Sequence, residues 1–259
     1  MKLYTLLENT TCKPDLCTEH GLSLYLEACG HKILFDAGQT DAFFYNAKLL
    51  DVDLNAVDIA ILSHGHYDHG GGMFDFLKLN ERAPLYIHKN AFGERYNGRG
   101  TFIGLDEALR HNSRIRYTSG ITVLADGLTL LDCNERLPVI PLNPYGLSLV
   151  QDGKLVADDF LHEQYLLVEE NGKRVLITGC SHKGIINLVS WFEPDILIGG
   201  FHFKSETNPA VLRSYGEQLL QHKTIYYTGH CTGEEQYNLL KGMMGEQLHY
   251  IRTGTVLEF

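Results

Sequence analysis

Three histidines and one aspartate lie within six positions, directly after the apolar run at residues 59–62. Polar side chains at the end of a buried strand need partners there, and divalent cations satisfy imidazoles and carboxylates together. In an extended chain, His64 and His66 point to the same side and can share one ion. Asp68 and His69 follow where the chain turns, so they can serve a second ion nearby. The spacing therefore predicts a metal site rather than a histidine-rich surface turn without a ligand.

Such a site would support hydrolysis. Two neighbouring ions can clamp the attacking and the leaving oxygen of a displacement, and they polarise a carbonyl or phosphoryl oxygen. Metal coordination also lowers the pKa of bound water toward about 7, so a hydroxide nucleophile exists at neutral pH. We expect zinc, with two ions per chain. Iron and manganese are the alternatives, because imidazole and carboxylate ligands suit them too.

Four further apolar stretches end in residues of metal-binding type near glycine. The stretch "KILFDAG" ends at Asp36, "VLITGCSHKG" contains His182, "DILIGGFHF" contains His202, and "TIYYTGHCTG" contains His230. Ligands gather at strand ends in α/β sheets. We therefore expect these segments to converge on the cluster at residues 64–69.

Strand and helix patterns alternate in both halves of the chain, which favours two sheets packed face to face with helices outside. The first three strands form a meander, and the loop at residues 134–153, rich in proline and glycine, connects the halves. Strands are predicted at residues 3–7, 22–27, 32–36, 59–62, 84–88, 165–169, 174–178, 195–198 and 224–228, and helices at 41–50, 73–77, 184–192 and 210–222.

Length and charge bound the other properties. At 259 residues and 44% hydrophobic content, we expect one α/β domain with one large core. The net charge of −10 argues against nucleic acid as a partner and favours a small-molecule substrate. We see no secretory signal and no apolar run long enough to cross a bilayer, so we expect a soluble cytoplasmic protein with no membrane partner and free thiols. The sequence leaves open whether the protein forms a homo-oligomer.

Taken in order along the chain, the motifs indicate a particular protein family. The ordered series "FDAG", "SHGHYDHGGG", "GCSHKG" and "TGHCTG" resembles the metallo-β-lactamase superfamily over nearly the whole chain. The resemblance implies an α/β fold of the four-layered αβ/βα sandwich type, with a one- or two-metal site between the sheets. The segments "EHGLSLYLE", "DDFLHEQYLLV" and "GCSHKGIINLV" are similar to the subgroup named for the dihydropterin ribofuranosylaminobenzene phosphate synthases.

The resemblance also implies roles for individual residues. Asp36 matches the carboxylate that supports the site from behind, where a hydrogen bond to a ligand imidazole fixes the tautomer. Asp36 and Asp68 are therefore the expected catalytic carboxylates. The implied ligands are His64, His66 and His182 for the first ion, and Asp68, His69 and His230 for the second.

One departure from the family pattern concerns the bridge between the ions. Many superfamily members place an aspartate there, from the strand after the third motif, but here that strand ends in Gly199, Gly200 and then His202. Either His202 takes part as a ligand or lies near the substrate, or water alone bridges the ions.

Other candidates have weaker support. His162 could donate a proton near the ions or be a hydrogen-bonded loop histidine, and His20 has a similar standing. Cys180 and Cys231 flank two predicted ligands, but small buried cysteines are common, and we expect a structural role. The remaining histidines are expected to lie at the surface or to be satisfied internally: His31, His88, His111, His222 and His249.

Two further groups of residues lie near the motifs. Arg95, Asn97 and Arg99 lie between glycines and could hold a phosphate, although a solvated surface loop is the favoured interpretation. The aromatic residues beside the predicted ligands could stack on a flat substrate ring or pack in the core; they are Tyr67, Phe201 and Phe203.

The favoured function is a metal-dependent hydrolase or transferase acting on a small, phosphorylated and therefore anionic metabolite. In the subgroup reaction, an arylamine would attack a pterin methylene carbon while the ions hold a pyrophosphate leaving group. The alternatives are a non-enzymatic metal or metabolite sensor that uses the same pocket, and an iron-dependent thiol dioxygenase or redox enzyme. A nuclease is least favoured because of the negative charge.

Overall fold

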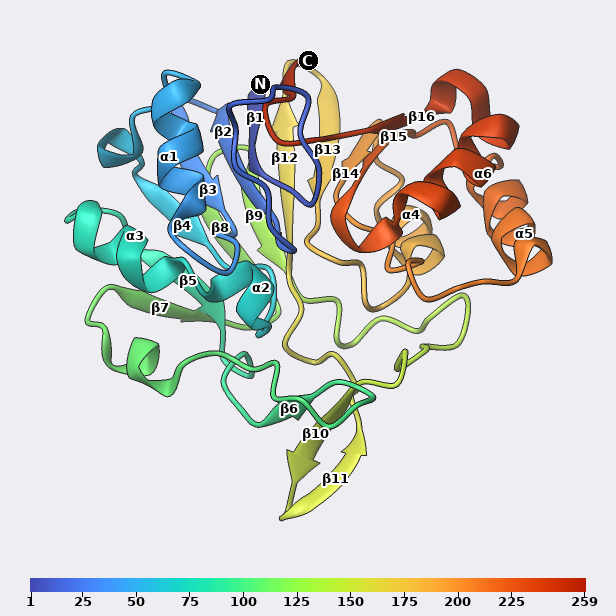
Figure 1. The fold of residues 1–259 in the computed structure, drawn as a ribbon, viewed down its shortest axis with the longest axis horizontal. Helices are drawn as coiled ribbons and strands as arrows, with labels where there is room; N and C mark the ends of the chain where they lie inside the picture. The colour runs from blue at the N-terminus through green and yellow to red at the C-terminus, as the bar shows by residue number, and fades with distance from the viewer.

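Two seven-stranded β-sheets pack face to face in the computed structural model, which describes residues 1–259. Figure 1 shows two helices on the outer side of the first sheet, α1 (Ala42–Leu49) and α3 (Met73–Leu79). Three helices lie on the outer side of the second sheet: α4 (Ile185–Phe192), α5 (Pro209–Leu219) and α6 (Glu234–Met244). The order of layers is helix, sheet, sheet, helix. The predicted four-layered αβ/βα sandwich is therefore confirmed.

The first sheet begins with the predicted antiparallel meander and continues with parallel strands. In the parallel part, Phe35 at the end of β3 pairs with Ile61 at the end of β4. The residues that follow these two strands therefore leave the sheet at the same edge. The order is β17 (Val256–Glu258), β1 (Lys2–Leu7), β2 (Ser23–Ala28), β3 (His31–Phe35), β4 (Ile59–Ile61), β5 (Leu85–His88) and β7 (Ile115–Thr118).

The second sheet has the same division into an antiparallel and a parallel part. Leu176, Leu197 and Tyr226 stand side by side on three neighbouring parallel strands, so these strands also end together. The order is β16 (Leu248–Tyr250), β15 (Ile225–Thr228), β14 (Ile196–Ile198), β13 (Lys173–Ile177), β12 (Tyr165–Glu170), β9 (Leu128–Leu131) and β8 (Ile121–Ala125).

Apolar side chains hold the layers together in three clusters. The middle cluster lies between the sheets and joins residues such as Ile33 and Ile61 of the first sheet to Leu166 and Ile177 of the second. The outer clusters pack helices on each sheet. Strands such as β14 are buried at every position because both faces of their sheet are covered.

Six α-helices complete the fold. The helix α5 has Asn208 as its N-cap, whose side chain accepts a hydrogen bond from the backbone N–H of Ala210, followed by proline at the first helical position. None of the helices combines the length and the apolar character that crossing a bilayer requires. The helices are α1 (Ala42–Leu49), α2 (Tyr67–Gly70), α3 (Met73–Leu79), α4 (Ile185–Phe192), α5 (Pro209–Leu219) and α6 (Glu234–Met244).

The loop predicted at residues 134–153 is wrong in its second part. A hairpin of β10 (Ser148–Gln151) and β11 (Lys154–Ala157) pairs there with β6 (Arg95–Tyr96) in a small third sheet, which extends away from the sandwich in Figure 1. Asp152 and Gly153 join its strands with φ angles of 50° and 71°. An Asp-Gly pair between two apolar runs favours this tight turn, and the nearby prolines masked that signal.

Asn46 of α1 connects this helix to the segment that follows β1. Its buried amide donates to the carbonyl oxygens of Leu6 and Cys17, at 2.8 and 2.9 Å, and accepts from the N–H of Cys17 at 2.8 Å. Asn46→Ala would leave the buried carbonyl of Leu6 and two partly buried backbone groups of Cys17 unpaired, so the free energy of unfolding should fall by about 2–3 kcal/mol. Urea denaturation measures this change. The exposed control Gln221→Ala should change it by less than about 0.5 kcal/mol, and an equal effect in both variants would contradict the assignment.

Candidate metal centre

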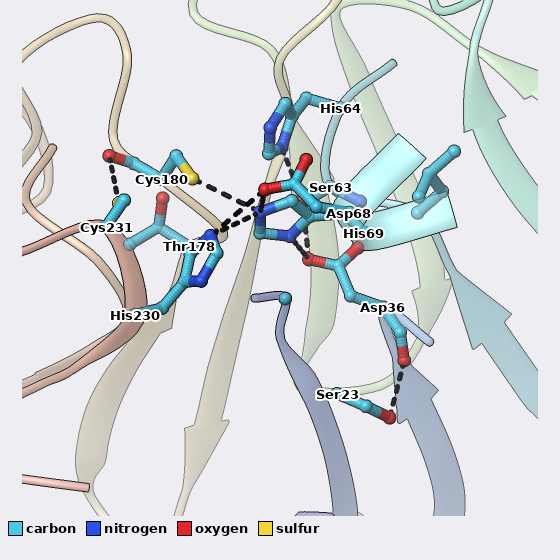
Figure 2. Close-up of polar contacts among 12 residues, drawn as sticks. Ser23, Asp36, Ser63, His64, Asp68, His69, Thr178, Cys180, His230 and Cys231 are labelled. Atoms are coloured by element: carbon cyan, nitrogen blue, oxygen red, sulfur yellow. Dashed lines mark hydrogen bonds and ion pairs between the residues drawn. The ribbon is translucent and has the colours of Figure 1, made fainter. Parts of the chain in front are cut away.

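The polar residues that follow the parallel strands meet at one edge of the two sheets. From the first sheet come Asp36, after β3, and the segment 64–69, which follows β4 and includes α2. From the second sheet come His182, His202 and His230, after β13, β14 and β15. Figure 2 shows His230 facing the side chains of the segment 64–69 across the gap between the sheets.

The first group of candidate ligands is His64, His66 and His182. One ring nitrogen of each lies within 4.8 Å of the others, and the Nε2 atoms of His64 and His182 are 3.3 Å apart. All three side chains are buried. Nε2 of His66 and Nδ1 of His182 have no hydrogen-bond partner, which costs about 1–3 kcal/mol for each buried polar atom. A bound cation would satisfy Nε2 of His66.

The second group is Asp68, His69 and His230. Nε2 of His69 and Nε2 of His230 are 3.1 Å apart. Oδ2 of Asp68 lies 3.4 Å from His230 Nε2 and 3.9 Å from His69 Nε2. The ring centroids of His64 and His69 are 4.2 Å apart, so the two groups adjoin.

The hydrogen bonds made by the Nδ1 atoms fix the tautomers of the histidines. They therefore determine which ring nitrogens present a lone pair to the centre. Nδ1 of His69 donates to Asp36 at 2.7 Å, and Nδ1 of His230 donates to Oδ1 of Asn9 at 2.9 Å. In the neutral rings, both Nε2 atoms are then unprotonated and face each other at 3.1 Å. Two lone pairs at this distance repel unless a proton or a metal ion lies between them.

Ser63 orients His64 in the same way. The Ser63 hydroxyl donates to Oδ2 of Asp36 at 2.7 Å, and it therefore accepts from Nδ1 of His64, also at 2.7 Å. Nε2 of His64 is left as a lone pair toward His182. Asp36 thus orients imidazoles in both groups, through Ser63 in one and directly in the other.

The spacing fits divalent ions of the zinc class. Ligands bound at 2.0–2.1 Å around a tetrahedral zinc ion lie about 3.3 Å from one another. Three separations match this value: 3.3 Å for His64 and His182, 3.1 Å for His69 and His230, and 3.4 Å for Asp68 and His230. The nitrogen and oxygen donors present therefore fit metal at both groups.

The charge states of most of these side chains also suit metal binding. Burial, and then the charges of neighbouring side chains, lower the pKa of His64, His66 and His182 well below the usual value. These rings are neutral at pH 7, the form that binds metal. Burial raises the pKa of Asp68, but His69 and His230 outweigh this effect and hold it well below its usual range, so Asp68 is a carboxylate. His69 is the exception: burial lowers its pKa, but Asp36 and Asp68 outweigh burial and leave the pKa raised, so a metal ion must displace a proton from this ring.

A cavity of about 440 Å³ opens onto both groups. Tyr67, Tyr145 and Leu147 form part of its wall, and Lys204 is the only lysine or arginine in the lining. The cavity therefore combines aromatic surface with one permanent positive charge beside the candidate ligands.

Residues 18–230 match the family model for the metallo-beta-lactamase superfamily. The chain belongs to this superfamily. The membership predicted from the motifs is confirmed, and the match includes every candidate ligand.

Individual relatives agree with this assignment. The chain is 27% identical to the 7,8-dihydropterin-6-methyl-4-(beta-D-ribofuranosyl)-aminobenzene-5'-phosphate synthase of Methanocaldococcus jannaschii, over 100% of this chain and 97% of the relative. It superposes on Tm1679, described as a metal-dependent hydrolase of the beta-lactamase superfamily, with a TM-score of 0.82 and 26% identity, over 100% and 99% of the two chains. Zn²⁺-bound PqqB from Methylobacterium extorquens shares the fold, with a TM-score of 0.59 and 11% identity over the full length of both chains.

Four of the twelve non-glycine residues with positive φ angles lie at this superfamily site. Asp36, Ser181, His202 and His230 have φ angles of 60°, 55°, 55° and 52°. A residue with a side chain in this left-handed region costs about 1–3 kcal/mol, and it persists only where its surroundings enforce the conformation. For His230, a hydrogen bond of 2.5 Å from its backbone N–H to Oε1 of Glu8 contributes to that enforcement.

His162 lies behind the ligands rather than in the cavity. It is fully buried, and its Nδ1 accepts a hydrogen bond from the N–H of Gly65 at 2.9 Å. Its Nε2 therefore carries the proton and lies 3.5 Å from Oδ2 of Asp158. Burial, and then the charge of Arg95, lower the pKa of His162 to about 4. The ring is neutral at pH 7 and supports the turn that carries His64 and His66.

The surface-loop interpretation of Arg95 is wrong. Arg95 is 5% exposed, donates to the carbonyl oxygens of Asn90 and Ala91, and lies 3.4 Å from Asp158. The pairing of β6 with β10 brings the side chain of Arg95 next to Asp158. Its positive charge is therefore used inside the fold. Asn97, two residues later, does line the cavity.

The other predicted candidates divide between the cavity and the core. His202 lines the cavity, and its ring centroid lies 4.5 Å from that of His182. His20 also lines the cavity, and its Nε2 lies 3.4 Å from Oδ2 of Asp68. Phe201 and Phe203 are buried in the outer core cluster of the second sheet, which favours packing over substrate stacking.

Our sequence reasoning missed Glu8, Asn9 and Glu163. Glu8 and Asn9 hold the backbone and the ring of His230, and Glu163 accepts from the N–H groups of His182 and Lys183 at 2.7 and 3.0 Å. Glu8 and Asn9 directly follow the predicted strand 3–7, so the strand-end pattern was present. The other strand ends with residues of metal-binding type also contain glycine, whereas no glycine lies next to Glu8 or Asn9.

Asp36→Asn should weaken zinc binding by about 10- to 100-fold. The variant keeps the size of the side chain but places an amide against the hydrogen-bond donors of Ser63 and His69, which then lose their orientation. Competition with a chromophoric chelator measures the affinity. The control Asp106→Asn changes a carboxylate that caps a short turn away from the site. Equal zinc affinity of Asp36→Asn and the native protein would contradict the assigned role.

Proposed function

We propose that this protein is a metal-dependent hydrolase that acts on a small, phosphorylated metabolite at a centre of two divalent ions, with zinc as the expected metal. The observation that carries the proposal is the pair of adjoining ligand groups at the base of one cavity. Each group offers three donors, and the unprotonated nitrogens face inward. Membership of the superfamily supports the same conclusion.

The side chains of this protein would hold and orient the reacting groups. His64, His66 and His182 would hold one ion, and Asp68, His69 and His230 the other. Bound divalent ions supply a water of lowered pKa and polarise the oxygen atom of the substrate. Asp36 fixes the imidazoles of both groups before substrate arrives, so little reorganisation is needed during the reaction.

The cavity supports an anionic substrate of limited size. Lys204 and the ion sites give the cavity a local positive charge, although the whole chain has a net charge of −10. Asn97 and Ser205 in the lining offer hydrogen bonds to phosphate oxygens. A volume of about 440 Å³ fits a metabolite rather than a polymer.

A second candidate is a pterin-linked transferase. The full-length similarity to the Methanocaldococcus jannaschii synthase favours it, and Tyr67 and Tyr145 offer aromatic faces to a flat ring. In that reaction an arylamine replaces water as the nucleophile. Incubating the zinc-loaded protein with a dihydropterin diphosphate, with and without an arylamine, distinguishes the two. A product that forms only with the amine favours the transferase.

The metal ligands provide the test of the proposal. We expect about two zinc ions per chain and metal-dependent turnover in a panel of phosphoesters, thioesters and lactams, which a chelator abolishes and added zinc restores. His66→Ala and Asp68→Ala should lower kcat/KM by at least about 100-fold, because each removes a ligand that holds the polarising ions. His222→Ala alters a half-buried histidine outside the site and should leave turnover unchanged.

Three outcomes would contradict the hydrolase. Undiminished turnover of His66→Ala and Asp68→Ala would show that the centre is not used. Tight binding of a metabolite without any turnover would favour the sensor. Protein purified without added zinc that holds iron and consumes oxygen with a thiol would favour the dioxygenase.

A further inference from the structure

Two cysteines lie beside the candidate ligands, and Figure 2 shows the sulfur of Cys180 directed toward His69. Cys180 and Cys231 are only 3% and 6% exposed, and both thiols are free. Sγ of Cys180 lies 3.2 Å from Nε2 of His69, the nitrogen that Asp36 leaves unprotonated. Sγ of Cys231 lies 3.7 Å from the carbonyl oxygen of Cys180. The two sulfurs thus lie among donors that already fit metal.

Cys180 adjoins both ligand groups. Its Sγ lies within 4.8 Å of a ring nitrogen of His64 and of His69, and also within 4.8 Å of a nitrogen of His230 and the sulfur of Cys231. His64 belongs to the first group, whereas His69 and His230 belong to the second. The sulfur of Cys180 therefore lies beside donors of both groups.

The strand that ends beside this place carries no carboxylate there. After β14 come Gly199 and Gly200, and a Cβ at Gly200 would lie 2.3 Å from Sγ of Cys231. A Cβ at Gly199 would lie 2.1 Å from the carbonyl oxygen of Thr178. The sulfur of Cys231 occupies the space that a longer side chain on this strand would need.

The two thiols would raise the number of protein ligands to four at the first ion and five at the second, and a fifth position at the first ion would remain for water or substrate. Each group supplies three donors from histidine and aspartate, and structural and catalytic zinc ions take four or five ligands. Tetrahedral zinc with one sulfur ligand at 2.3 Å and one nitrogen ligand at 2.0–2.1 Å separates these atoms by about 3.5 Å. The 3.2 Å between Cys180 and His69 is close to this separation.

We propose that Cys180 binds as a thiolate between the two ions, and that Cys231 binds as a thiolate to the ion held by Asp68, His69 and His230. The inference rests on the proposed two-ion centre and adds the class of metal: thiophilic cations such as zinc, cobalt and cadmium, in preference to magnesium or manganese. On binding, each S–H bond breaks, its proton passes to solvent, and a sulfur–metal bond forms. No electron is transferred.

Cobalt titration of the full-length, metal-stripped protein tests this proposal. We expect two Co²⁺ ions per chain and an intense near-ultraviolet absorption band from thiolate-to-cobalt charge transfer. Cys180→Ser should remove most of this band, and Cys231→Ser part of it. Cys133→Ser is the matched control, because Cys133 is also buried but does not line the cavity, and its band should equal that of the native protein.

A second measurement compares cadmium with manganese as the only added metal. In Cys180→Ser, the preference for Cd²⁺ over Mn²⁺ should fall by about tenfold or more, because a soft ligand is lost while the nitrogen and oxygen ligands remain. The same preference should be unchanged in Cys133→Ser.

The outcomes separate this proposal from the proposed function. Two bound cobalt ions without a charge-transfer band in the native protein would overturn the thiolate ligands and leave the hydrolase standing. A band that persists in both Cys180→Ser and Cys231→Ser would also overturn them. No cobalt binding at all would contradict the two-ion centre, and with it both proposals.

Discussion

The structure depends on unprotonated ring nitrogens that face one another at hydrogen-bond distance. The Nε2 atoms of His69 and His230 are 3.1 Å apart, and neither can donate in the neutral form because each ring uses its one proton at Nδ1. The second nitrogen pair, His64 and His182, is 3.3 Å apart. The contact between His69 and His230 is unfavourable unless a proton or a metal ion lies between the two nitrogens, so the fold places these ligands where they can share one bound cation.

The sandwich maintains this arrangement by placing the ends of its parallel strands at one edge. Phe35 pairs with Ile61 in one sheet, and Leu176 with Leu197 in the other, so the residues that follow leave the sheets together. Several of these residues adopt left-handed backbone conformations that cost free energy. The apolar cluster between the sheets stabilises the arrangement against that cost. A centre built on strand ends can therefore be rigid although its backbone is strained.

Much of this could be predicted from sequence, because short apolar runs that end in histidine or aspartate indicate both the strands and the ligands. The meander, several of the later strands and the segment 64–69 followed from such runs. The part that could not be predicted depends on which strand ends become neighbours. Glu8 lies 222 positions before His230, whose backbone N–H donates to its carboxylate, and no local pattern relates the two residues. The position of Cys180 between both groups also follows only from the pairing of the sheets.

The central claim is that two inorganic ions lie between the facing imidazoles. Anomalous diffraction at the zinc absorption edge, from crystals of the zinc-loaded protein, tests it most directly. The account predicts two peaks, one among His64, His66 and His182 and the other among Asp68, His69 and His230. Full-occupancy peaks elsewhere, or no peak at these positions in a protein that retains its fold, would contradict it.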